Sequence, residues 1–343
     1  MNAPPPSAAW RMPAEWEPHE RCLLAWPTRA DLWGPYAERA KSEYAATVDA
    51  IAAFEAVTLV VAPGQAAEAR AACTAAIDVA EIPIDDSWLR DSGPIFTVDA
   101  AGARSGVDFV FNSWGERFLP FDKDAAVGKA LLEYLAIPRR GSAMVLEGGS
   151  ITVDGEGTLI TTEQCLLNRN RNPSLTRGDI ETELARTLGT TTVIWLAWGH
   201  HEDEHTDGHV DGVCAFVRPG VVIAQSCDDP ANPNHALMAR NLELLRAARD
   251  ARGRALEIIE LPHFPYFDLD GARLMTSYPN FYVANGGVIV PIADHPLDAD
   301  ALAIIARAFP EREVVGVPSR VIAYGGGGTH CITQQVPRAS AHA

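Results

Sequence analysis

A cysteine that closely follows a run of glycines is the strongest candidate nucleophile in this sequence. Four consecutive glycines occupy positions 325–328, and two residues separate them from Cys331. Glycine allows unusual backbone conformations and a close approach of the backbone to a ligand. We therefore predict a thiolate nucleophile at Cys331 and a substrate contact at Gly328. A surface turn is the alternative, and a phosphate loop is disfavoured because no Lys-Ser/Thr or GxGxxG pattern accompanies the glycines.

A polar segment rich in histidine and acids supports two different interpretations. His201, Glu202, His205 and Asp211 match the spacing of a zinc metalloprotease, in which Glu202 would be the general base. That motif requires a helix, but the segment is almost wholly polar and follows a glycine. The favoured interpretation is a loop followed by a strand beginning near His209. Residues two apart share one face of a strand, so His209 and Asp211 would point into one site.

Carboxylates beside an indole form a second candidate site. Asp86, Trp88 and Asp91 lie close together before a Gly-Pro turn. Carboxylates can pair with a guanidinium while an aromatic face stacks on it, so this segment suits a planar cation. An internal salt bridge to Arg90 is the alternative.

Two further polar positions follow turn-like sequences. Glu147 precedes a Gly-Gly pair and a short β-branched run, where its carboxylate could orient a histidine; a turn glutamate is the simpler alternative. Asn280 and Asn285 flank an aromatic strand. Because Asn-Gly is a turn signal, a hairpin is expected at Asn285, with substrate hydrogen bonding as a second possibility.

The bulk composition indicates a globular protein with a cationic ligand. The chain has 343 residues and a formal net charge of −17, with 47% hydrophobic residues. An acidic surface repels phosphate backbones and anionic headgroups, so we expect neither a nucleic-acid nor a membrane partner. No apolar run approaches the ~18 residues that span a bilayer. The six cysteines contain no CxxC pair and no secretion signal is evident, so we expect reduced thiols and a cytoplasmic protein.

Helical and strand patterns alternate along the chain without a linker. An N-terminal helix is predicted over 36–54, and five further amphipathic helices begin near Gln65, Lys123, Ile180, Ala236 and Asp298. Short β-branched runs separate them, at 57–61, 95–98, 159–162, 193–195, 221–224 and 288–291. The five helix starts recur about every 60 residues, which suggests a radial architecture such as a propeller. A doubly wound α/β sheet is the alternative.

Taken together, these segments resemble the agmatine deiminase family, which is related to bacterial peptidyl-arginine deiminases. The resemblance covers nearly the whole chain, and its most specific part is the glycine run followed by His-Cys-Ile-Thr-Gln-Gln. The other matching segments occur in the family's order: 12–16, Trp26-Pro27, 88–94, 147–162, 165–173 and 208–211.

The resemblance implies a pentein fold, a five-bladed pseudo-symmetric α/β propeller with its active site in the central channel. It implies one catalytic domain over residues 1–343 that hydrolyses agmatine to N-carbamoylputrescine and ammonia without metal or cofactor. A homo-oligomer is possible. The alternatives are a deiminase of another guanidino compound such as free or peptidyl arginine, the zinc metalloprotease, and a polyamine-binding protein without activity.

Individual roles follow by position in the family's motifs. Cys331 resembles the nucleophile, His209 the general acid and base, and Glu147 the carboxylate that orients the histidine. Asp91 and Asp211 resemble the pair that binds the guanidinium nitrogens.

Other positions match less closely. Trp88 and Asp86 are expected to face the substrate. This sequence departs from the family at Thr152, where many relatives have histidine, and at 204–207, which is more basic than the usual acidic run.

Overall fold

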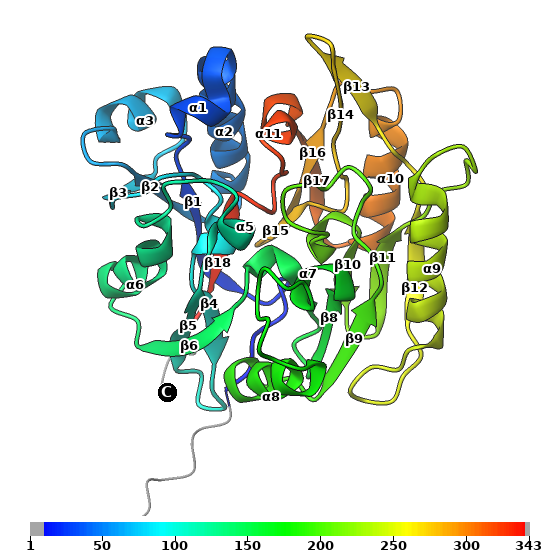
Figure 1. Ribbon diagram of the computed structural model, residues 1–343. Helices are drawn as coiled ribbons and strands as arrows, with labels where there is room; N and C mark the ends of the chain where they lie inside the picture. The colour runs from blue at the N-terminus through cyan, green and yellow to red at the C-terminus, as the bar shows by residue number, and fades with distance from the viewer. Residues whose placement is uncertain (1–9, 340–343) are drawn as a thin grey trace, which may run out of the picture.

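The computed structural model describes residues 10–339, which form five mixed β-sheets and one separate hairpin (Figure 1). The first sheet contains, in spatial order, β18 (Thr333–Pro337), β1 (His19–Ala25), β2 (Ala56–Val61) and β3 (Asp78–Glu81). The next two are β4 (Ile95–Val98), β5 (Arg104–Val110), β6 (Arg139–Val145), and β7 (Ile151–Val153), β8 (Thr158–Thr162), β9 (Thr192–Leu196). The last two are β10 (Cys214–Arg218), β11 (Val221–Gln225), β12 (Glu257–Leu261), and β15 (Tyr282–Ala284), β16 (Gly287–Ile292), β17 (Glu313–Pro318). The hairpin consists of β13 (Tyr266–Leu269) and β14 (Ala272–Met275).

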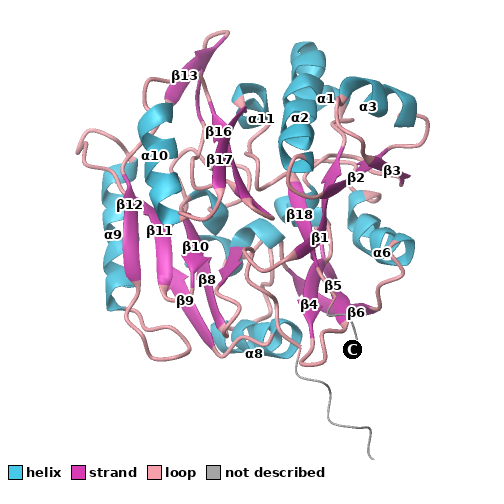
Figure 2. Ribbon diagram, turned by 180° about the vertical axis from the view of Figure 1, so that it is seen from behind, coloured by secondary structure: helices cyan, strands magenta, loops and turns pink. Residues whose placement is uncertain are grey.

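The five sheets repeat one pairing pattern. Each has a strand with an antiparallel neighbour on one side and a parallel neighbour on the other; these strands are β1, β5, β8, β11 and β16. Parallel neighbours require a crossover, and here each crossover contains a helix. The five crossover helices are α2 (Ala37–Ala52), α6 (Asp124–Tyr134), α8 (Arg177–Leu188), α9 (Asn234–Ala247) and α10 (Asp298–Ala308). Figures 1 and 2 show the sheets following one another around the molecule, with these helices toward its outside.

The shorter helices occupy connections. They are α1 (Ala30–Trp33), α3 (Ala66–Ala72), α4 (Leu89–Ser92), α5 (Ser113–Glu116), α7 (Glu163–Leu166) and α11 (Arg320–Tyr324). Several of them lie directly beside candidate site residues, as described below. Within the described residues, no helix has the length and apolarity needed to cross a bilayer.

All six predicted helices and all six predicted strands are present, within a few residues of the expected positions. The assignment of the repeat was wrong in its first unit. The crossover helix there is the N-terminal α2, whereas α3, predicted from Gln65, leads to the additional strand β3. Spacing alone favoured α3 because it continues the interval of about 60 residues. The doubly wound alternative is also wrong, because the strands form separate sheets.

Helix ends follow local sequence signals. Helix α8 begins at a capping box, in which the Thr176 side chain and Asp179 satisfy each other's backbone N–H groups. It ends at Gly189 in the left-handed conformation (φ 74°), which glycine adopts without a Cβ penalty. Helix α2 buries Ala40, Tyr44 and other residues on one face against β2 and β17. These ends and faces fix where the connecting loops emerge.

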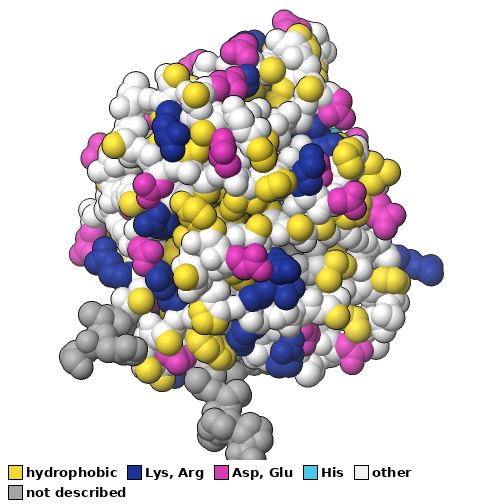
Figure 3. Space-filling model, turned by 90° about the vertical axis from the view of Figure 1, so that its left-hand side faces the viewer, with side chains coloured by type: hydrophobic (Ala, Val, Ile, Leu, Met, Phe, Trp, Pro, Cys, Tyr) yellow, Lys and Arg dark blue, Asp and Glu magenta, His cyan; other side chains and the backbone are white. Residues whose placement is uncertain are grey.

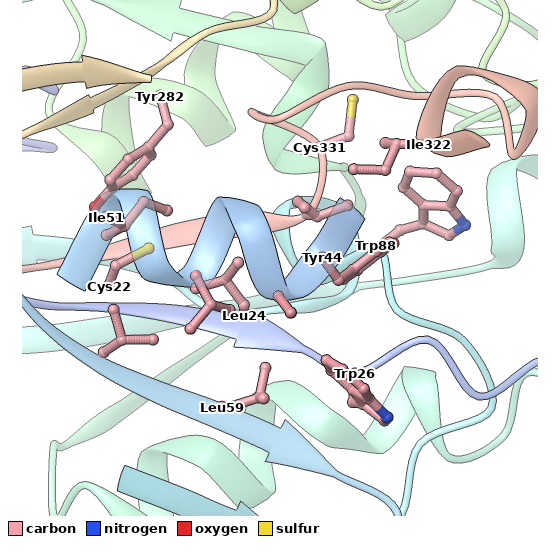
Figure 4. Close-up of a cluster of buried hydrophobic side chains, with 14 of the residues drawn as sticks. Cys22, Leu24, Trp26, Tyr44, Ile51, Leu59, Trp88, Tyr282, Ile322 and Cys331 are labelled. Atoms are coloured by element: carbon pink, nitrogen blue, oxygen red, sulfur yellow. The ribbon is translucent and has the colours of Figure 1, made fainter. Parts of the chain in front are cut away.

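The largest apolar cluster packs under α2 and extends to the candidate nucleophile. Figure 4 shows Cys331 and Trp88 at one edge of this cluster, with Leu24 and Leu59 from β1 and β2 beneath α2. Leu24 and Leu59 are fully buried. A close-packed floor of this kind holds the attached loops rigidly, because side chains in a dense interior cannot shift independently.

The two ends of the chain meet in the first sheet. Strand β18 pairs antiparallel with β1, and β1 pairs parallel with β2 (Figure 2). The segment before β1 reaches β4 and the end of α8: the Arg11 N–H donates to the Val98 carbonyl and the Met12 N–H to the Leu188 carbonyl, both at 2.9 Å. The loop that carries Cys331 is therefore tied to the N-terminal strand.

Candidate active site

The glycine run passes between two tryptophans and an asparagine. A Cβ atom at Gly325 would lie 2.5 Å from the Trp33 ring, and one at Gly327 would lie 2.5 Å from the Trp88 ring. A Cβ at Gly328 would lie 2.5 Å from Asn280 Oδ1. Since real Cβ atoms do not approach other atoms this closely, the close packing of this loop requires the glycines.

Cys331 is buried beside an amide and a carboxylate. Asn280 Nδ2 donates to the Cys331 sulfur at 3.2 Å, and Asp211 Oδ2 lies 3.4 Å from the same sulfur. Burial and the charges of Asp211 and Asp91 raise the thiol pKa well above its usual value, although hydrogen bonds from Gly328 and Asn280 oppose this. A cation that neutralises the carboxylates would remove much of the effect.

His209 lies between two carboxylates. Its Nδ1 is 3.8 Å from Asp91 Oδ2, and its Nε2 is 3.8 Å from Glu147 Oε2. Burial by itself lowers the pKa of His209. Asp91, Cys165 and Glu147 together raise it by more, so the pKa lies well above the usual value. At these distances neither nitrogen is committed to a hydrogen bond with a carboxylate, so the ring can exchange a proton with a bound molecule.

The expected strand at His209 is not present. Residues 210–212 form a single 3₁₀ turn, and β10 begins only at Cys214. His209 and Asp211 nevertheless face one cavity because this turn directs both side chains inward. Their convergence was correctly predicted, but the strand that was expected to produce it was wrong.

Glu147 is fully buried and paired with Arg171. Arg171 Nε donates to Glu147 Oε1 at 2.6 Å, and both side chains are 0% exposed. Burial by itself would raise the pKa of Glu147, but His209 and Arg171 lower it below its usual value. Glu147 is therefore an anion directed at His209 through its second oxygen. Arg171 was not singled out from the sequence, although it lies in the segment 165–173 that carries part of the family resemblance.

Asp91 is held by two donors. Trp114 Nε1 donates to its Oδ2, and the Gly149 N–H donates to its Oδ1, both at 2.9 Å. Burial raises the pKa of Asp91 to about 6. Trp114 comes from α5, whose backbone has positive φ at Ser113 and Trp114, and no sequence pattern indicated its role.

Gly149 lies where His209 and the two aspartates meet. A Cβ at this position would lie 2.7 Å from His209 Nδ1 and 2.9 Å from an oxygen of Asp91 and of Asp211. The Gly-Gly pair after Glu147 was visible in the sequence, but the need for glycine at its second position was not.

A cavity of about 200 Å³ opens over these residues. His209, Asp211, Asn280, Gly328 and Cys331 line its inner part. The 202–206 loop, β14 and Tyr324 also line it. A small second hollow, lined by Trp88, Asp91, Trp114 and Phe118, meets the cavity at Cys331 and His205. Trp88 and Gly328 thus lie beside Cys331, and their contact with a substrate stays a prediction.

Two residues predicted to contact substrate lie elsewhere. Asp86 Oδ2 pairs with Arg29 Nε at 2.9 Å, and both side chains are buried away from the cavity. Asn285 uses both atoms of its amide on the backbone of His19, at 2.9 Å each. Their contacts hold the fold together, which corrects both predictions. Asn280, the other asparagine of the aromatic segment, lies in the site instead.

The zinc metalloprotease interpretation is also wrong. The residues from His201 to Gly208 form turns and bends without a helix, so the two histidines are not arranged as that motif requires. Asp211, its third ligand, is bound to His330. Within the described residues, one group brings three potential ligand atoms within 4.8 Å of one another: Glu147, Cys165 and His209. The Arg171 guanidinium on Glu147 disfavours a second cation there.

Comparison with known proteins agrees with this arrangement. The model of the Porphyromonas-type peptidyl-arginine deiminase family matches residues 11–337. The chain belongs to this family. It is 45% identical to an agmatine deiminase of Pseudomonas aeruginosa strain LESB58, with 97% of each chain covered.

Solved structures give the same result. The agmatine deiminase of Enterococcus faecalis superposes with a TM-score of 0.93 at 34% identity over 96% of each chain. A Cys→Ser variant of the C. jejuni agmatine deiminase with substrate bound has a TM-score of 0.88 at 27% identity, covering 96% of this chain and 97% of that one. The family resemblance predicted from the sequence is confirmed, together with an α/β fold of mixed sheets.

The packing at Gly149 gives a direct prediction. Gly149→Ala should lower kcat/KM by about 100-fold, because a methyl group displaces His209 or the aspartates by a fraction of an ångström to an ångström. Gly141→Ala is the matched control, since a Cβ there meets nothing closer than Arg139 at 4.0 Å. Steady-state kinetics with circular dichroism would check both variants. Unchanged kinetics in a folded Gly149→Ala would contradict the proposed geometry.

Proposed function

We propose that this protein hydrolyses the guanidinium group of agmatine to give N-carbamoylputrescine and ammonia. The observation that carries the proposal is the grouping of a thiol, a histidine and three carboxylates at one place. Cys331, His209 and Asp211 line the cavity, Asp91 lines the adjoining hollow, and Glu147 lies behind His209. This is the donor set needed to bind a planar cation and attack its carbon. The family and the names of the similar proteins agree with it.

The carboxylates bind and orient the substrate. Asp91 and Asp211 accept hydrogen bonds from the guanidinium nitrogens on either side of the Cys331 sulfur. Trp88 and Gly328 line the space next to the sulfur. Asn280 donates to the sulfur and stabilises its negative charge.

The first half of the reaction releases ammonia. The Cys331 thiolate attacks the guanidinium carbon, and a C–S bond forms as the carbon becomes tetrahedral. His209, as the imidazolium, gives its proton to the departing nitrogen while the C–N bond breaks. Glu147 stabilises that imidazolium from the side opposite Asp91. An amidino thioether on Cys331 remains.

The second half consumes water. The neutral His209 takes a proton from water, the hydroxide that results adds to the amidino carbon, and the C–S bond then breaks. The remaining hydroxyl proton leaves as the carbonyl forms, and the released ammonia takes it up to become ammonium. The products are a ureido group and the Cys331 thiolate. Over the cycle one guanidinium and one water become a urea and an ammonium ion. The Cys331 proton, released to solvent when the substrate binds, returns when the product leaves, and His209 ends as the imidazolium with which it began.

The two carboxylates beside the Cys331 thiol indicate how the thiolate is formed. Asp91 and Asp211 hold the thiol in its neutral form in the free enzyme, since both raise its pKa. A guanidinium placed between them offsets their charge and favours the thiolate. We therefore propose that the substrate ionises Cys331.

The remaining expectations concern architecture and surroundings. We propose that the five sheets with their shared pairing pattern close into a five-bladed pseudo-symmetric propeller, forming one catalytic domain. We also propose a cytoplasmic location, no nucleic-acid partner and a possible homo-oligomer. Figure 3 shows acidic and basic side chains interspersed on one face, so the net charge of −17 is not a single patch on that face.

A substrate panel tests the function. Agmatine, arginine, an arginine-containing peptide and other guanidines would be incubated with the protein, and ureido product and ammonia measured. We expect turnover of agmatine with the highest kcat/KM and none with Cys331→Ala. Cys227→Ala, which changes a cysteine outside the cavity, is the control that should retain activity. Preference for arginine or the peptide would move the assignment to another guanidino substrate, and activity of Cys331→Ala would exclude the mechanism.

Ionisation of Asp91 predicts an acid limb in the pH profile. Because the pKa of Asp91 is raised to about 6, kcat/KM should fall as the pH drops through about 6 and the carboxylate loses its charge. Trp114→Phe removes a donor that stabilises the charged form, so it should move this limb upward by roughly half to one pH unit. Trp198→Phe, at a tryptophan that is 45% exposed, is the control. An acid limb that stays in place in Trp114→Phe would contradict the role of Asp91.

A further inference from the structure

Three buried charged side chains lie behind Asp211 and are not used in the proposed reaction. His330 Nδ1 lies 2.9 Å from Asp211 Oδ2, and His330 Nε2 lies 2.8 Å from Glu15 Oε1. Arg90 Nη1 donates to Glu15 Oε1 at 3.4 Å, and Arg90 Nε donates to the His330 carbonyl at 3.3 Å. The side chains of His330, Asp211 and Arg90 are at most 6% exposed, and that of Glu15 is 14% exposed.

The two contacts of the His330 ring determine its protonation state. A neutral imidazole has one N–H, so one of its nitrogens would direct a lone pair at a carboxylate oxygen. Only the imidazolium donates to both Glu15 and Asp211. A protonated carboxyl would be the other way to satisfy the contact, but Arg90 on Glu15 and the guanidinium expected at Asp211 both favour the ionised carboxylates.

The charges alternate from the N-terminal segment to the cavity. Arg90 is positive, Glu15 negative, His330 positive and Asp211 negative, with Asp211 Oδ2 3.4 Å from the nucleophilic sulfur. Each buried charge is thereby compensated by its neighbour. This compensation is needed because an unpaired charge is costly to bury. The chain ends at the place where the substrate's positive charge is proposed to bind.

We propose that His330, held as an imidazolium by Glu15, is a positioning residue that keeps Asp211 ionised and oriented for the guanidinium. Glu15, on the N-terminal segment, thus acts on substrate binding without touching the substrate, because its effect passes through His330 and Asp211. The contact with His330 fixes Asp211 Oδ2 at 3.4 Å from the Cys331 sulfur, so the carboxylate cannot rotate freely. This inference rests on the proposed function for its kinetic consequence, but the charge state of His330 does not depend on that function.

The electrostatics of the cluster agree with the geometry. Burial and Arg90 lower the pKa of His330, but Glu15 and Asp211 raise it above its usual value. In the opposite direction burial raises the pKa of Glu15, yet His330 and Arg90 lower it to about 2. Among the described residues, Arg90 on α4, Glu15 on the N-terminal segment and Asp211 on the 3₁₀ turn are the charged side chains that hydrogen-bond to His330.

Glu15→Gln tests the kinetic part. The amide of Gln can donate to Nε2 of a neutral His330, so the variant keeps the packing and both hydrogen bonds but removes the need for the imidazolium. As the pH increases and His330 loses its proton, the charge-assisted hydrogen bond that orients Asp211 becomes a neutral one. We therefore expect KM for agmatine to rise about tenfold, with little change in kcat. Wild type should show no such rise over the same range. Glu17→Gln changes a carboxylate that pairs with Arg11 and should behave as wild type.

The outcome separates a positioning role from a structural one. A residue that only stabilised the fold would lower the melting temperature and leave the pH dependence of KM unchanged. Glu15→Gln with the wild-type KM at every pH would overturn the proposal.

A second measurement determines the charge of His330 directly in the wild-type protein. The ¹⁵N chemical shifts of the histidine ring nitrogens would be recorded for wild type against pH, with the His330 signals assigned by their loss in His330→Gln. We expect both ring nitrogens of His330 to be protonated at neutral pH, in the absence of any substrate. A neutral His330 at pH 7 would overturn the proposal even if agmatine is turned over. Conversely, an imidazolium in a protein that does not act on agmatine would refute the proposed function alone.

Discussion

Burial of Asp91, Glu147 and Asp211 in one region is favourable only if each carboxylate faces a positive charge or a donor. Glu147 has Arg171, Asp211 has His330, and His209 lies between Glu147 and Asp91. Asp91 depends on the N–H groups of Trp114 and Gly149, and its pKa of about 6 shows that this compensation is incomplete. A cation that binds beside Asp91 would complete the compensation of its charge.

The same interaction predicts that the thiol is unreactive until a cation binds. Neutral Cys331 is the stable form next to two carboxylates, so adventitious oxidation or alkylation is disfavoured. A guanidinium is both the group that relieves the repulsion and the group that is attacked. Binding and activation are therefore one event, which connects the electrostatics to selectivity for cations.

Much of the fold could be predicted because its signals are local. The face of α2 that contains Ala40 and Tyr44, and the valine-rich run of β2, follow from periodicity and β-branched composition. The edge strands β3 and β6 are short or mostly polar and lack such a pattern. The closure of the first sheet by β18 could not be predicted, because it joins residues about 300 positions apart.

The site could be predicted only in part, for a related reason. Cys331, His209 and Glu147 stand in recognisable local patterns, and the family resemblance gave their roles. Trp114 and Arg171 reach the site from irregular loops, and their contacts depend on tertiary packing. Asp86 and Asn285 have suitable chemistry, but the fold uses it internally, on Arg29 and on the backbone of His19.

The most direct test of this account is the pKa of the Cys331 thiol with and without a bound cation. It would be measured from thiolate ultraviolet absorbance against pH, as the difference between wild type and Cys331→Ala, with and without a guanidinium compound that is not turned over. We predict a midpoint well above the usual ~8.5 in the free protein and a midpoint at least about one pH unit lower when the site is filled. An identical midpoint in both states would contradict the claim that the bound cation generates the nucleophile.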